Sequence, residues 1–213
     1  GLINAIKITD RSKRQAKIVL NGSGAAGIAI IKLLNLYGFE DIIVCDSKGI
    51  ISKSRIKELN KQKKEVLEFT NKDNLEGDLK VALRDADVFI GVSKADLLDE
   101  NDIRTMAKNP IIFALANPNP EIKPELAKKA GVNIMATGRS DYPNQINNVL
   151  VFPGIFKGAI AARKKNITDK MKLEAAVALA SFVKKPKYDK IIPNPFEKGI
   201  ADLIAKAVME CKK

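Results

Sequence analysis

The sequence predicts an α/β fold built on a mostly parallel β-sheet, and three observations support this prediction. Short apolar runs occur at residues 18–20, 42–45 and 111–116, and segments with helical spacing of apolar residues separate them. The runs are continuously apolar, which is typical of strands buried on both faces of a parallel sheet. The connections are short. The sequence therefore predicts one doubly wound domain over residues 1–213, with flanking helices and further helices at the C-terminal end.

Apolar spacing predicts the elements in the first half of the chain. Helices are expected at residues 2–8 and 28–36, and strands at 18–20 and 42–45. The lysine-rich segment that follows, as far as Lys64, is expected to be a solvated surface connection. A short strand at 66–69 and an amphipathic helix at 79–83 come next.

Caps and prolines predict the elements in the second half. Asp99 is the expected N-cap of a helix reaching about Ala107, and Thr168 is the expected N-cap of a helix over 171–182. Proline fixes φ and removes a backbone donor, so the strand at 111–116 must stop before Pro118. The remaining expected elements are strands at 87–93 and 132–135 and helices at 121–130, 155–162 and 200–208.

The glycine-rich stretch after the first strand is the strongest motif. Gly22 permits a tight turn, Gly24 lets the backbone approach a pyrophosphate, and Gly27 lets the helix pack closely on its strand. Phosphates favour the exposed N–H groups at the start of such a helix. Asp46 ends the next strand, 19 positions after Gly27, where an acid that binds an adenosine ribose is expected. A turn residue or helix cap is the alternative role for Asp46.

These features predict a Rossmann-like dinucleotide-binding fold with NAD as the cofactor. The candidate cofactor-binding residues are Gly22, Gly24, Ala25, Ala26, Gly27 and Asp46, together with Val92 and Ser93 after the strand at 87–93. Asn117 is presented at the same carboxyl edge of the sheet. The segment 139–153 is rich in asparagine, which suits recognition of hydroxyl and carboxylate groups but equally suits loops and caps.

Composition narrows the function classes. Lysine and arginine total 37 against 25 acids, but the positive charge is almost all lysine, scattered among acids and without interleaved aromatics, so nucleic-acid binding is not expected. The chain has no apolar stretch of membrane-spanning length and no signal-peptide pattern, so a cytoplasmic location is expected. Cys45 and Cys211 are expected to be reduced thiols. Histidine is absent, which removes the commonest general base and zinc ligand.

Several motifs together resemble malic enzymes, in particular the NAD(P)-binding domain of the small bacterial type. The motifs are GSGAAG at 22–27, CDSKGII at 45–51, FIGVS at 89–93, IIFALANPNPEI at 111–122 and TGRSDYPNQINNVLVFPGIFKGA at 137–159. The resemblance implies oxidative decarboxylation of malate to pyruvate and carbon dioxide with NAD or NADP. It also implies that Asn117, Asn147 and Asn148 contact the nicotinamide, its ribose or malate.

The resemblance also implies a missing partner. In the family, a separate N-terminal domain supplies a tyrosine acid, a lysine base and acidic ligands for a divalent metal, Mg or Mn, and none of these motifs is in this chain. Tyr37, Tyr142 and Tyr188 match no catalytic motif. We therefore expect a fragment or processed product that is inactive alone, belongs to a homo-oligomer in its parent, and has no metal ligands of its own.

Three alternatives stay open from the sequence. The chain is either part of a malic enzyme, a stand-alone module that senses dinucleotide without chemistry, or part of another dehydrogenase with the same fold. The cofactor is also open, because Asp46 favours the free 2′-hydroxyl of NAD whereas Lys48 could pair with the 2′-phosphate of NADP.

Overall fold

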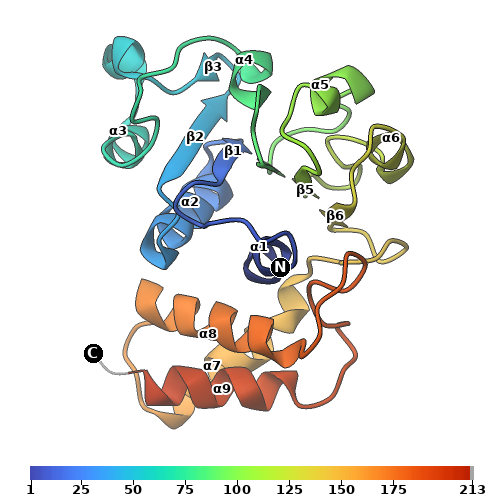
Figure 1. Cartoon of the computed structure of the whole chain (residues 1–213). Helices are drawn as coiled ribbons and strands as arrows, with labels where there is room; N and C mark the ends of the chain where they lie inside the picture. The colour runs from blue at the N-terminus through green and yellow to red at the C-terminus, as the bar shows by residue number, and fades with distance from the viewer. Residues whose placement is uncertain (212–213) are drawn as a thin grey trace.

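The computed structural model describes residues 1–211, so the last two residues of the predicted domain lie outside the described part. The strands form a six-stranded sheet in the order β3-β2-β1-β4-β5-β6 (Figure 1). Its members are β1 Lys17–Asn21, β2 Asp41–Asp46, β3 Gly49–Ile50, β4 Val88–Gly91, β5 Ile111–Ala114 and β6 Ile134–Thr137. All neighbouring pairs are parallel except β2 and β3. The predicted mostly parallel, doubly wound sheet is confirmed.

Helices cover both faces of the sheet because successive strand residues point to opposite sides. Ile18 and Leu20 of β1 join one buried cluster, whereas Val19 between them joins the other. The first cluster includes residues of α1 Leu2–Ile8, α2 Ala25–Tyr37 and α3 Lys61–Leu67. The second includes residues of α4 Leu79–Leu83, α5 Glu100–Arg104 and α6 Pro124–Lys129.

Three C-terminal helices form a separate layer below the sheet in the view of Figure 1, and α1 lies between them and the sheet. They are α7 Phe152–Ala161, α8 Asp169–Phe182 and α9 Ile200–Glu210, with a buried cluster of their own. Asn4 ties α1 to this layer, because its buried side-chain amide donates to the carbonyls of Ala180 and Ile191 at 3.0 and 2.9 Å.

Local signals account for the helix boundaries that the sequence predicted. Asp99 accepts from the backbone N–H groups of Asn101 and Asp102, and the Asp102 side chain accepts from the Asp99 N–H, which completes a capping box. Thr168 accepts from the N–H of Met171 at the start of α8. Gly131 follows α6 with a φ of 96°, a left-handed conformation that glycine adopts without strain.

Two local predictions were wrong, and one short strand was not predicted. Residues 66–69 form the end of α3 and the turn after it rather than a strand, because Val66 and Leu67 are buried on a helical face. Helix α6 begins at Pro124, and Glu121 precedes it as a buried residue. The short antiparallel strand β3 was not predicted, because two residues carry too little periodicity to be recognised.

Cys45 lies in β2 and is fully buried. Burial, together with the nearby carboxylates of Asp46 and Asp78, raises the pKa of its thiol to about 12. The thiol therefore stays protonated at neutral pH, in agreement with a structural role.

None of the helices within residues 1–211 has the length and apolar character needed to cross a membrane.

Candidate functional site

The glycine turn between β1 and α2 is shaped as the motif predicts. Gly22 has a φ of 116°, and a Cβ there would lie 2.7 Å from the Val92 carbonyl oxygen. A Cβ on Gly27 would overlap the Gly22 carbonyl, so only glycine lets α2 start this close to the turn. Gly24 has nothing within 4 Å of the corresponding position. The turn is therefore open where a ligand would approach the backbone.

The start of α2 has the properties of an anion site. Gly24 is its N-cap and offers no side-chain hydrogen bond to the first N–H groups. Gly24, Ala25 and Ala26 are all exposed. Because the helix dipole concentrates partial positive charge at these N–H groups, a pyrophosphate there would be stabilised.

The ends of three neighbouring strands meet beside this turn. Asn21 of β1 pairs with Gly91 of β4, and Gly91 pairs with Ala114 of β5. The Asn21 side-chain amide donates to the Ser93 hydroxyl at 2.6 Å. Val92, Ser93 and Asn117 therefore follow strands that end at the same edge, and Ser93 and Asn117 are exposed there. In a doubly wound sheet the ligand crevice lies at the carboxyl ends of the strands, so these residues lie where a ligand is expected.

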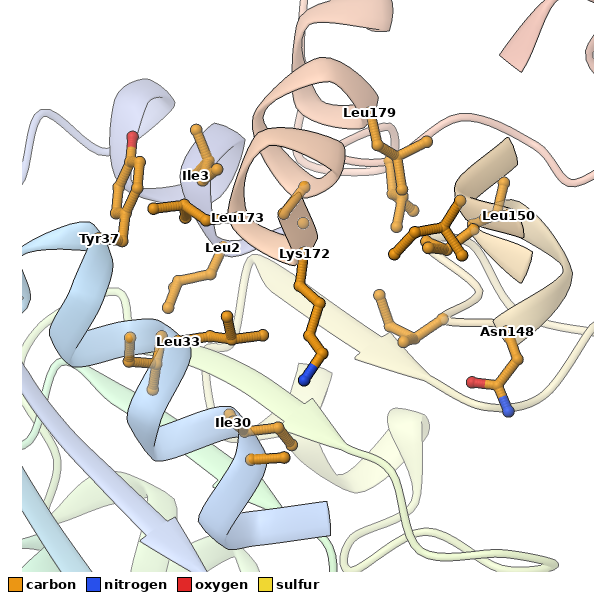
Figure 2. A pocket seen from close by; sticks show the side chains of 18 of the residues that line it. Leu2, Ile3, Ile30, Leu33, Tyr37, Asn148, Leu150, Lys172, Leu173 and Leu179 are labelled. Atoms are coloured by element: carbon orange, nitrogen blue, oxygen red, sulfur yellow. The ribbon is translucent and has the colours of Figure 1, made fainter. Parts of the chain in front are cut away.

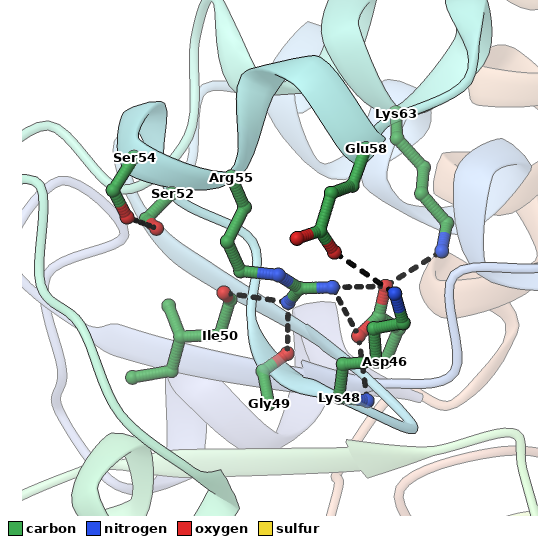
Figure 3. A network of polar contacts seen from close by, with 9 residues as sticks. All are labelled: Asp46, Lys48, Gly49, Ile50, Ser52, Ser54, Arg55, Glu58 and Lys63. Atoms are coloured by element: carbon green, nitrogen blue, oxygen red, sulfur yellow. Dashed lines mark hydrogen bonds and ion pairs between the residues drawn. The ribbon is translucent and has the colours of Figure 1, made fainter.

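Asp46, at the end of β2, lies in a network of cations (Figure 3). Its carboxylate accepts from the Arg55 guanidinium at 3.0 and 3.1 Å and from the Lys63 ammonium at 2.6 Å. It also accepts from the Lys48 N–H at 2.9 Å. Burial acts to raise the pKa of Asp46, but the hydrogen bonds from Lys63, Lys48 and Arg55 outweigh it and hold the pKa below its usual value.

This network corrects the expectation for the lysine-rich segment. Arg55 and Lys63 are 17% and 22% exposed, so this segment is not merely a solvated connection. The Arg55 guanidinium also donates to the carbonyls of Gly49 and Ile50, which fixes it against β3. The Lys48 ammonium pairs with Glu58 at 2.9 Å, so the cations on Asp46 are Arg55 and Lys63 rather than Lys48.

The asparagines have different surroundings. Asn144 is buried and structural, since its amide donates to the carbonyls of Met135 and Tyr188 and its oxygen accepts from the Ile191 N–H. Asn147 caps the short helix η2, Asn148–Leu150, by accepting from the Val149 N–H. Asn148 is exposed. These residues follow β6, which neighbours β5, so the segment lies along the same edge of the sheet as Asn117.

A mostly apolar groove with a volume of about 700 Å³ lies between α2, α8 and the segment from η2 to α7. Its lining includes Ile30, Leu33, Leu150, Leu173 and Leu179, with Asn147 and Asn148 at the same groove (Figure 2). In Figure 2 the Lys172 side chain extends from α8 into this space. The groove lies along α2, and residues 22–27 of the glycine turn are not part of its lining.

Sequence reasoning missed Arg55, Lys63 and Glu121. The two cations were hidden among many surface lysines, and no spacing rule distinguishes them. Glu121 had one available signal, because it lies between Pro120 and Ile122 and the twelve residues before it, 109–120, carry no charge.

No metal site is formed by the described residues alone. Within residues 1–211 no group of three His, Cys, Asp or Glu side chains is close enough to hold a metal ion.

The fold and the turn define a dinucleotide-binding Rossmann domain: an open glycine turn, an uncapped helix N-terminus and an acid at the end of the second strand. The family model described as "Malic enzyme, NAD binding domain" matches residues 1–212. The chain belongs to the malic enzyme family.

Curated relatives and solved structures agree with this assignment. The chain is 54% identical to the bifunctional malic/malolactic enzyme of Bacillus subtilis, over 98% of this chain and 51% of the relative. It is 49% identical to the NAD-dependent malic enzyme of Geobacillus stearothermophilus, over 99% of this chain and 44% of the relative. The crystal structure of the NAD-dependent malic enzyme of Thermotoga maritima has a TM-score of 0.94 and 44% identity, over 98% of this chain and 55% of that one.

The chain thus spans about half the length of these relatives. Relatives of both cofactor types match, since the NADP-dependent malic enzyme of Rhizobium meliloti is 44% identical over 99% of this chain and 30% of the relative.

Proposed function

We propose that this chain is the dinucleotide-binding half of a protein that oxidatively decarboxylates malate to pyruvate and carbon dioxide with NAD or NADP. The open glycine turn carries the proposal, because Gly24 leaves space at the exposed start of α2 while Gly27 allows the close helix packing. The dinucleotide, when bound, accepts a hydride at its nicotinamide ring. The chain's own residues bind and orient it.

The roles of individual residues follow from their places in the fold. The first N–H groups of α2 bind the diphosphate, and Asp46 lies where the adenosine ribose is expected. Asn117 and Asn148 are exposed at the carboxyl edge of the sheet, where neutral amide donors suit a carboxylate or a carboxamide. Asn147 uses its side-chain oxygen as a cap, which leaves its NH₂ group as the part available to malate.

Catalysis needs groups that residues 1–211 do not bring together. Malate loses its C2 hydride only as its hydroxyl is deprotonated, and the enol formed by decarboxylation must then be protonated. The described part of the chain contains no metal-binding cluster, and histidine is absent from the sequence. We therefore assign the acid, the base and the metal ligands to the other half of a protein as long as the relatives.

The apolar groove is the surface that fits this other half. The relatives are about twice as long as this chain, and the groove is bordered by Asn147 and Asn148 beside the proposed substrate position. Phe152 and Phe156 line it while about half exposed, at 54% and 50%, and their rings stack with centroids 6.0 Å apart. Covering these side chains would remove apolar area from water, which favours association.

Calorimetric titration with NAD tests the dinucleotide site. The chain should bind NAD, and Gly24→Val should weaken binding by about tenfold or more, because the new side chain fills the open turn without a clash. Gly138 is another glycine with nothing within 4 Å and follows β6 at the far edge of the sheet, away from the glycine turn. Gly138→Val is therefore the matched control: titrated with ADP, it should bind like wild type, whereas Gly24→Val should bind ADP as weakly as it binds NAD. Unchanged affinity in Gly24→Val would contradict the site.

Turnover assays test the division of labour. The chain alone, mixed with malate, a divalent metal and NAD or NADP, should form no pyruvate, whereas the protein that also carries the other half should be active. Pyruvate formation by the chain alone would refute the proposal. A dinucleotide sensor without chemistry, the alternative from the sequence, would instead bind NAD equally well and stay inactive in the longer protein.

A further inference from the structure

Glu121 is the most deeply buried acidic side chain of the crevice region, with 0% exposure. Within residues 1–211 neither oxygen pairs with a cation: one accepts from the Ser93 N–H at 3.1 Å and the other from the Ala116 N–H at 3.0 Å. Burying an ionised carboxylate is costly unless hydrogen bonds stabilise it, and bonds from backbone N–H groups to a carboxylate are among the strong ones. The Glu121 carboxylate is therefore costly to bury, and its hydrogen bonds to the backbone of two loops offset this cost.

The two loops that Glu121 joins belong to the dinucleotide crevice. Ser93 follows β4, and Ala116 follows β5 and directly precedes Asn117. The Glu121 backbone carbonyl also accepts from the N–H groups of Leu97 and Leu98, at 2.8 and 2.9 Å. Both its side chain and its backbone thus hold the segment after β4.

The contacts continue to the glycine turn. The Ser93 hydroxyl accepts from the Asn21 amide, and Asn21 directly precedes Gly22. Gly91 is required for this arrangement, because a Cβ there would overlap the Glu121 carboxyl group. A continuous set of polar contacts therefore runs across the carboxyl ends of β1, β4 and β5.

We propose that Glu121 is a positioning residue that sets the nicotinamide half of the dinucleotide site by holding the Ser93 loop and the Ala116–Asn117 loop at a fixed separation. This inference rests on the proposed function. Glu121 is too deeply buried to touch the dinucleotide, so it acts through the backbone of the two loops. The adenosine half depends on the glycine turn and Asp46, which Glu121 does not contact.

Glu121→Gln is the sharpest test, because glutamine has the same shape but only one accepting atom. Its NH₂ group would face either the Ser93 N–H or the Ala116 N–H, and one loop would be released. We expect NAD affinity to fall by about tenfold or more, while ADP affinity stays within about twofold of wild type. Glu125→Gln is the matched control, since Glu125 is exposed on α6 and bonds only to Tyr142 in the described contacts.

Distinct outcomes separate the two proposals. Unchanged NAD affinity in Glu121→Gln, or an equal loss of NAD and ADP affinity, would overturn the positioning role. A wild-type chain that binds neither ligand would instead overturn the dinucleotide site. Amide hydrogen exchange in the wild-type chain is the test if Glu121→Gln does not fold or if the wild type does not bind. The Ser93 and Ala116 amides, which donate to Glu121, should exchange slowly with solvent. Exchange at the rate of an open loop would overturn the positioning role.

Discussion

Groups of the protein already occupy the hydrogen-bond acceptor positions of the Asp46 carboxylate. A carboxylate offers about four acceptor positions, and Arg55, Lys63 and the Lys48 N–H supply four hydrogen bonds. A ribose hydroxyl can therefore reach Asp46 only by displacing a partner. Lys63 is the partner best able to leave, since a lysine ammonium sits on a flexible stem whereas Arg55 is also bonded to two carbonyls.

Lys63→Ala should separate the two cofactors. NAD affinity should stay within about twofold of wild type, because removing Lys63 frees a carboxylate oxygen for the ribose. NADP affinity should fall by about tenfold, because the 2′-phosphate loses a cation beside Asp46. Calorimetric titration with NAD and with NADP measures both affinities. Lys64→Ala is the control, because Lys64 is the exposed neighbour of Lys63 in α3. Equal loss of both cofactors would contradict the cofactor-specific role of Lys63.

Asp46 should also make stability depend on pH. Its pKa is lowered in the folded state, so its contribution is fully present above the unfolded-state value of about 3.9 and is lost as the pH falls through the lower folded-state pKa. At about pH 7, Asp46→Asn should destabilise the chain by about 1–3 kcal/mol, and this difference should shrink as the pH falls through the folded-state pKa of Asp46. Urea unfolding of both proteins across this range measures the difference; a difference independent of pH would contradict the ionic contribution.

At the scale of elements, the joint between β1 and α2 shapes the proposed dinucleotide site. Glycines act differently at its two ends: Gly27 is needed for packing, whereas Gly24 only keeps the turn open. The C-terminal layer shows the same use of glycine, since a Cβ on Gly158 of α7 would lie 2.5 Å from the Ala205 carbonyl oxygen of α9. Glycine at positions 27 and 158 therefore allows α2 and α7 to pack closely on their neighbours.

Two alanine substitutions should distinguish the role of Gly27 in the packing of α2 from the role of Gly24 in keeping the turn open. Gly27→Ala should destabilise the chain by about 1–3 kcal/mol and weaken NAD binding, because the new methyl group pushes α2 away from the Gly22 carbonyl. Gly24→Ala should cost no more than about 1 kcal/mol, the difference between glycine and alanine at an N-cap, because its Cβ meets nothing. Urea unfolding with NAD titration measures both effects. Equal destabilisation by the two variants would contradict the assignment.

At the scale of the whole molecule, the sheet and the C-terminal layer leave the apolar groove between them. The groove is bounded by α2 on one side and by α7 and α8 on the other, so its shape depends on how the two layers pack. The proposed second half would cover this surface and complete the active site at the same time.

The groove should bind an apolar dye in the chain alone. Anilinonaphthalene sulfonate should fluoresce with the wild-type chain, and Phe156→Glu should reduce the signal because it replaces an apolar ring in the groove with a carboxylate that repels the anionic dye. Phe196→Glu is the control, since Phe196 is 92% exposed and does not line the groove. The longer protein should also give a weaker signal. An equally strong signal from the longer protein would contradict the proposed docking surface.

The sequence predicted the sheet and most helices because apolar periodicity and caps are local properties. The Asp99 capping box, the Thr168 cap and the apolar run of β5 were all recognised from neighbouring residues. The glycine turn and Asp46 could be placed for the same reason, since their motif specifies spacing along one stretch of chain.

The sequence by itself determined the α/β class, the position of the glycine turn and the membership of the malic enzyme family, because each depends on motifs of residues close together in the chain. Only the tertiary structure decided which cations surround Asp46, that Asn144 is structural, and that Glu121 joins the loops after β4 and β5. The physical reason is that a buried polar side chain is bonded to groups that folding brings to it, and their distance along the chain does not reveal them.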